Sequence, residues 1–88
     1  MPAEESLYAP SQAIRASQFI SEALKTGRKV VFWTPAASDV CIKTDNQLLR
    51  LLQEHGEGKV EVEVEIGGLK RVFRFTKLVV KSLYTKKK

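Results

Sequence analysis

Cationic side chains are the residues of this chain best suited to bind a partner, and their excess lies near its C-terminal end. The chain has 88 residues, with 15 lysines and arginines against 10 aspartates and glutamates. Residues 1–57 carry six basic and seven acidic side chains, whereas residues 58–88 carry nine basic and three acidic ones. The net charge of +5 therefore comes wholly from the last third. Such an excess is typical of proteins that bind nucleic acid or an acidic protein surface.

Eight of the cations are predicted to contact nucleic-acid phosphates, because the arrangement inferred below leaves them outside the core. Lysine and arginine bind phosphate oxygens, and these contacts supply affinity without reading sequence. Arginines also alternate with aromatic residues over residues 71–75, a pattern that can stack bases on exposed rings. The last three lysines fit a solvated tail equally well. The predicted nucleic-acid-binding residues are Arg28, Lys29, Arg71, Lys77, Lys81, Lys86, Lys87 and Lys88.

Combinations of residues that could carry catalysis or bind a metal are scarce. Cys41 and His55 could form a nucleophile and its base, but the apolar neighbours of Cys41 favour a small buried cysteine instead. The three glutamates of residues 61–65 could bind a cation, yet basic residues face two of them in the hairpin described below. One cysteine and one histidine cannot form a Cys/His zinc site. The sequence predicts a protein with no enzymatic activity, cofactor or metal.

Trp33 is the residue best suited to a protein interface. It follows a short apolar run and precedes Thr34 and Pro35. A tryptophan in this position could fill the core, or it could be exposed and anchor a partner, since exposed tryptophans often dominate binding energy. The second functional hypothesis is therefore a protein-interaction module, such as a small adaptor or an inhibitor of a larger enzyme, that binds through Trp33.

A β-hairpin over residues 58–77 is predicted to carry five of the nine cations of residues 58–88. Four apolar residues alternate with three glutamates before the Gly67-Gly68 turn, and a turn of this type accepts positive φ at both positions. Folding the chain there pairs residues whose numbers add to 135. The facing pairs are Ile66 with Leu69, Val62 with Phe73, Val60 with Phe75, Glu65 with Lys70, Glu61 with Arg74, and Val64 with Arg71.

This register predicts that both phenylalanines point into the core and that the guanidinium of Arg71 extends outward. A basic amphipathic helix over residues 69–84 is the competing interpretation. The abundance of valine, phenylalanine and threonine disfavours that helix.

Two helices and one more pair of strands complete the predicted fold. Residues 11–26 have apolar residues at helical spacing, with Ser11 suited to the N-cap and Gly27 to the stop. Residues 28–33 and 39–43 read as two short antiparallel strands joined by a five-residue loop. A second helix would begin at Thr44 and Gln47, which have capping-box spacing, and would end at Gly56.

The sequence thus predicts a small α+β domain of order α-β-β-α-β-β, with two helices on one face of an antiparallel sheet. The other face would be polar and open to solvent or a partner. Residues 1–9 would form a flexible arm, residues 10–85 the domain and residues 86–88 a basic tail. The edge strands of the predicted sheet would allow two copies of the chain to pair as a homodimer. A single cysteine and the lack of an apolar run of membrane length favour a reducing, cytoplasmic compartment and no membrane contact.

Overall fold

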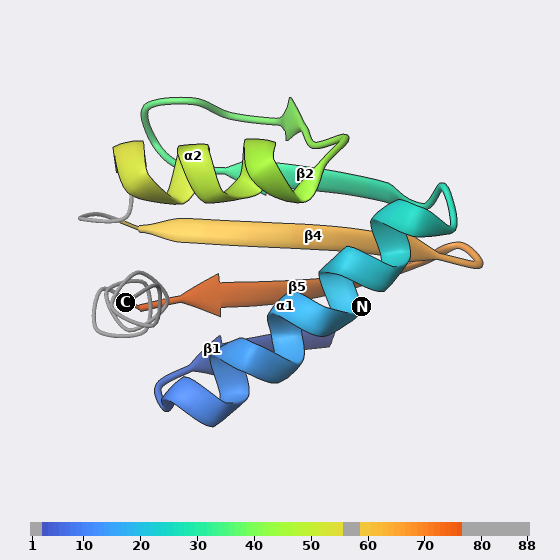
Figure 1. Ribbon diagram of the computed structural model, residues 1–88, viewed down its shortest axis with the longest axis horizontal. Coiled ribbons are helices and arrows are strands. Elements are labelled where there is room, and N and C mark those ends of the chain that lie inside the picture. The colour runs from blue at the N-terminus through green and yellow to red at the C-terminus, as the bar shows by residue number, and fades with distance from the viewer. Residues whose placement is uncertain (1–2, 56–58, 77–88) are drawn as a thin grey trace.

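The computed structural model describes residues 3–55 and 59–76, which form two helices and a sheet of five strands (Figure 1). The strand order in the sheet is β1-β5-β4-β2-β3. The predicted α+β class is confirmed, but the sheet is mixed rather than antiparallel. The elements are β1 (Ala3–Leu7), α1 (Pro10–Lys25), β2 (Lys29–Trp33), β3 (Val40–Cys41), α2 (Asp45–His55), β4 (Val60–Ile66) and β5 (Leu69–Phe75).

The hairpin of β4 and β5 has the predicted register. Val60 pairs with Phe75 and Ile66 with Leu69, and all seven pairs of residue numbers add to 135. Gly67 and Gly68 adopt φ values of 56° and 83°, the left-handed conformations that the turn requires. The competing helix over residues 69–84 is wrong where the structure describes it, because residues 69–75 are a strand.

The N-terminal residues form a strand that the sequence did not predict. β1 lies parallel to β5, with Ala3 paired with Arg71 and Leu7 with Phe75. Leu7 is only 3% exposed, and the Thr76 hydroxyl donates to the Leu7 carbonyl oxygen at 2.9 Å. The prediction of a loose arm is therefore wrong for residues 3–7. The partner of β1 lies at the opposite end of the chain, so no local pattern indicates this pairing.

The first helix begins one residue earlier than predicted. Pro10 takes the first helical position, where its missing N–H removes no hydrogen bond. The side chain of Gln12 turns back, and its Oε1 accepts the backbone N–H groups of Tyr8 and Ala9 at 2.9 and 3.0 Å. Ser11 is thus not the N-cap. Gly27 stops the helix as predicted, with φ of 78°.

The second helix begins with the predicted pair of polar side chains. The Thr44 hydroxyl accepts the Gln47 backbone N–H at 3.1 Å. Gln47 Oε1 accepts the N–H of Lys43 at 2.7 Å, whereas a regular capping box would use the N–H of Thr44. The predicted stop at Gly56 lies outside the described residues.

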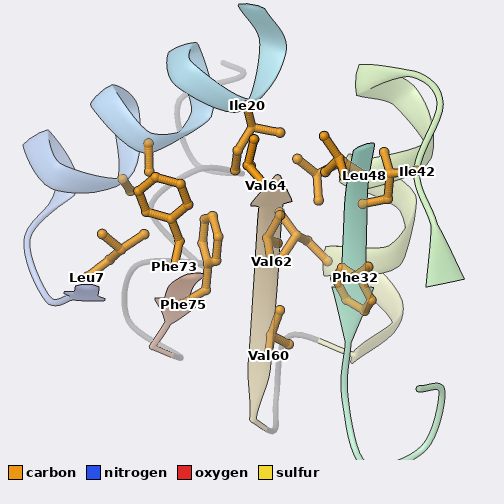
Figure 2. Close-up of a cluster of buried hydrophobic side chains, with 14 of the residues drawn as sticks. Leu7, Ile20, Phe32, Ile42, Leu48, Val60, Val62, Val64, Phe73 and Phe75 are labelled. Carbon is orange, nitrogen blue, oxygen red and sulfur yellow. The ribbon is translucent and has the colours of Figure 1, made fainter. Parts of the chain in front are cut away.

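A single buried cluster contains residues of both helices and of the sheet (Figure 2). The facing residues of β2, β4 and β5 supply its centre, and alanines at 13, 16 and 23 let α1 approach the strands closely. Ser21 Oγ donates to Asp45 Oδ2 at 2.6 Å and links α1 to α2. The cluster contains Leu7, Ala13, Ala16, Ile20, Ala23, Val30, Phe32, Ile42, Leu48, Leu52, Val60, Val62, Val64, Phe73 and Phe75.

Candidate functional site

Two of the predicted cations, Arg28 and Lys29, line a hollow at the end of the sheet where α1 leads into β2. The hollow has a volume of ≈ 330 Å³, and Lys43 joins Arg28 and Lys29 in its lining. All three side chains belong to exposed residues. They are the only charged residues among the described ones that line it, and its apolar wall comes from Leu24, Gly27, Val30, Cys41 and Ile42. We call Arg28, Lys29 and Lys43 the cationic end.

The chain builds the cationic end through one turn and one strand pair. The left-handed Gly27 reverses the chain directly after α1, and the Arg28 N–H donates to the Ala23 carbonyl at 2.9 Å. In the antiparallel pair of β2 and β3, Val31 faces Cys41, and the Ile42 N–H donates to the Val30 carbonyl at 2.9 Å. The same register, extended by one residue pair beyond Val30 and Ile42, places Lys43 beside Lys29.

Lys43 was missed from sequence, although a signal for it exists. The predicted strands over residues 28–33 and 39–43, joined by five residues, already imply that residues 29 and 43 face one another. The prediction that the two strands pair antiparallel is confirmed, although β3 is only two residues long.

The sheet face opposite the core carries acidic residues along its middle. Glu61, Glu63 and Glu65 of β4 are half-buried there. Arg74 Nε lies 3.1 Å from Glu61 Oε2, in the predicted pair. Lys70 faces Glu65 in the register as predicted, but its Nζ lies 3.9 Å from Glu63 Oε1. We call this surface the acidic face.

Arg71 lies on the other side of the sheet from Lys29 and Lys70. Its guanidinium carbon sits 4.6 Å from the centre of the Phe19 ring and 5.1 Å from that of Phe73, and the residue is half-buried. The structure therefore does not bring Arg71 to the cationic end. The predicted contact residues Lys77, Lys81, Lys86, Lys87 and Lys88 lie outside the described residues.

Two phenylalanines of β5 lie in the core, whereas Trp33 lies on the side of the acidic face. Phe73 and Phe75 are 1% and 3% exposed, as the hairpin register predicted, so their rings are not available to stack bases. Trp33 is half-buried and faces Glu61 across the strands, outside the core cluster. The alternative that Trp33 fills the core is therefore wrong.

Cys41 and His55 do not form a pair. Cys41 is exposed, which corrects the expectation of a buried thiol, because β3 is a short edge strand that leaves its outer side open. It faces Val31, whose neighbour Phe32 points into the core. The His55 ring lies near Phe32, with ring centres 6.1 Å apart, so the two side chains lie on opposite sides of the sheet.

The described residues were also searched for metal-binding groups and for membrane-spanning helices. Over residues 3–55 and 59–76, no group of three histidines, cysteines or carboxylates could hold a metal ion. Within the same part of the chain, neither helix is long and apolar enough to cross a membrane.

A comparison of the chain with protein-family models, with curated proteins and with solved structures gives no match in any of the three. Any assignment of function therefore depends on the residues and the geometry given above.

Proposed function

We propose that this chain binds nucleic acid through phosphate contacts and that the cationic end is the centre of the binding surface. The observation that carries the proposal is the meeting of Arg28, Lys29 and Lys43, from two separate segments, around a hollow with no acidic residue in its described lining. Positive charges held close together release condensed counterions from a nucleic acid, and this release drives phosphate binding. The protein needs no catalytic group for this function.

The C-terminal lysines belong to the same proposal on grounds of charge. Residues 58–88 carry a net charge of +6, from nine basic and three acidic side chains. Lys77, Lys81, Lys86, Lys87 and Lys88 would add to the attraction at long range, whereas the cationic end would fix the contact. An acidic protein surface is the alternative partner for the same cations.

Salt-dependent binding of a labelled oligonucleotide tests the proposal. The logarithm of affinity should fall linearly with the logarithm of salt concentration between about 50 and 200 mM. The double variant Lys29→Gln/Lys43→Gln removes two charges from the cationic end, and Arg50→Gln/Lys59→Gln removes two exposed charges elsewhere. The first variant should reduce the slope by about 1.5–2, because each duplex phosphate contact contributes about 0.9.

The control variant should keep nearly the slope of the unmodified chain. Equal losses in the two variants would show that only the net charge matters and would contradict a site at the cationic end. Binding that does not change with salt would contradict phosphate contacts altogether.

A protein partner on the acidic face is the second candidate, favoured by the position of Trp33. Since buried residues of both helices join one cluster, we propose that both helices cover the core side and that neither covers the acidic face. Trp33 and Val31 then lie on the side of the acidic face, each half-buried, and Val72 on the same side is 4% exposed. The sheet edges β1 and β3 offer a related proposal, the pairing of two copies.

This candidate is separated from the first by its response to salt and to variants. A complex or dimer retained at roughly 0.5 M salt, weakened by Trp33→Ala and unaffected by the Lys29→Gln/Lys43→Gln variant, would support it. Analytical ultracentrifugation of the chain alone would detect the dimer. A monomer at all concentrations would exclude pairing through β1 or β3.

A further inference from the structure

A second hollow, of ≈ 430 Å³, lies between α1 and the strands β1 and β5. Figure 1 shows α1 crossing these two strands. Small-molecule sites commonly have volumes of about 300–1,000 Å³ and combine apolar walls with a few polar groups. The described residues that line this one are Ser6, Leu7, Gln12, Arg15, Ala16, Phe19, Arg71 and Phe73.

The polar groups of this hollow are mostly donors. Arg15 and Arg71 are the only charged residues in its described lining, and both are arginines. Arg15 lies one turn of α1 before Phe19, so the two side chains share one face of the helix. Arg71 comes from β5, and its guanidinium lies over the Phe19 ring of α1, the helix that also carries Arg15.

The guanidinium of Arg71 is held against two aromatic rings. Its central carbon lies 4.6 Å from the ring centre of Phe19 and 5.1 Å from that of Phe73, within the range of cation–π contact. The two rings pack edge to face, with centres 5.7 Å apart. A guanidinium has five N–H donors in one plane, so Arg71 can bind a carboxylate or phosphate in addition to another partner.

We propose that this hollow binds a small anion that carries a carboxylate or phosphate beside a flat apolar group. Arg15 and Arg71 would both hold the anionic group. Phe19, which is half-buried, would contact the apolar group. This site is separate from the cationic end and does not depend on nucleic-acid binding.

The hollow exists because β1 docks beside β5. Ser6 and Leu7 form one of its walls, and the hydrogen bond from Thr76 to the Leu7 carbonyl fixes the end of that strand. The N-terminal strand therefore has a role beyond stability in this proposal, because it completes the binding site.

Titration of the full chain with sodium benzoate, followed by ¹H–¹⁵N NMR, tests the proposal at constant ionic strength. Benzoate has the anionic group and the flat ring, benzyl alcohol has only the ring, and inorganic phosphate has only the charge. Benzoate should give saturable shifts at the amides of Leu7, Phe19 and Arg71 by about 20 mM, as expected for a millimolar site. Benzyl alcohol and phosphate should each bind at least about 10-fold more weakly.

Charge variants then locate the site. Arg15→Gln should weaken benzoate binding by about 10-fold, whereas Arg50→Gln, an exposed arginine on α2, should leave it unchanged. Arg71→Lys keeps the charge but loses the planar fork, so it should bind benzoate more weakly than the unmodified chain. Arg15 is exposed on its helix, so its variant should fold normally even where a change at Arg71 does not.

Three results would overturn the proposal: no saturable shift at these amides, equal effects of Arg15→Gln and Arg50→Gln, or shifts centred on Arg28 and Lys43. Oligonucleotide binding by Arg15→Gln is measured in parallel. Because the two sites are separate, loss of benzoate binding with unchanged oligonucleotide binding would support the small-anion site whatever the outcome at the cationic end.

Discussion

The substitution Leu7→Ala tests whether the N-terminal strand belongs to the folded domain. Leu7 is 3% exposed and is part of the core cluster. Replacing a buried leucine by alanine lowers the free energy of unfolding by about 2–5 kcal/mol, depending on the cavity left behind. Leu7 also lines the hollow beside α1, so water can enter the vacated space. We therefore expect a loss near the lower limit, about 2–3 kcal/mol.

Such a loss is large for a chain of this size. A domain of 88 residues has a free energy of unfolding of about 4–13 kcal/mol. Unfolding in urea, followed by the fluorescence of Trp33, the single tryptophan, and by circular dichroism, measures the change. Tyr8→Ala is the matched control, because Tyr8 follows Leu7 directly and is 70% exposed. It should change the free energy of unfolding by no more than about 0.5 kcal/mol.

The test depends on the difference between the free energies of unfolding of the Leu7→Ala and Tyr8→Ala variants. If residues 3–7 were a loose arm, Leu7→Ala and Tyr8→Ala would have equal and small effects. Equal free energies of unfolding in the two variants would therefore refute the docking of β1, and with it the hollow that Leu7 lines.

Two further predictions follow from the backbone and from the edge of the sheet. Gly68→Ala should lower the free energy of unfolding by about 1–2 kcal/mol, because Gly68 has φ of 83°, whereas Gly68→Asn should cost less; urea unfolding compares them. The Cys41 thiol should react fully with a thiol reagent in the native protein without denaturant, because the residue is exposed; a rate limited by unfolding would contradict its position in β3.

The parts of the fold that sequence predicts are those set by neighbours along the chain. Alternation over Val60–Ile66 and the paired glycines determine the register of β4 and β5, because a slip by one residue would expose the valines. β1 lacks such a signal. Its five residues include two glutamates, and its partner β5 begins more than sixty residues later, so only the folded chain brings them together.

The residues of the candidate sites could likewise be predicted only where neighbours along the chain determine their positions. Arg28 and Lys29 were identified by their charge, and Lys43 could have been identified from the spacing of two short strands. The contacts of Arg71 with two aromatic rings could not have been predicted from the sequence, because Phe19 comes from a helix and Phe73 from a strand far along the chain. Periodicity describes the face of one element and does not specify which helix crosses which strand.

The acidic face limits how a nucleic acid could approach this chain. Glu61, Glu63 and Glu65 lie along the middle strand of the sheet. Arg74 Nε lies 3.1 Å from Glu61 Oε2, and Lys70 Nζ lies 3.9 Å from Glu63 Oε1. Phosphates crossing that face would meet these carboxylates beside Lys70 and Arg74, and Lys29 itself faces Glu65 across β2 and β4. The hollow at the cationic end has no acidic residue in its described lining. If the proposed function is correct, the backbone must therefore pass over the end of the sheet where β2 begins. The substitution Glu63→Gln should then strengthen oligonucleotide binding only at low salt, because its charge acts through solvent from a distance.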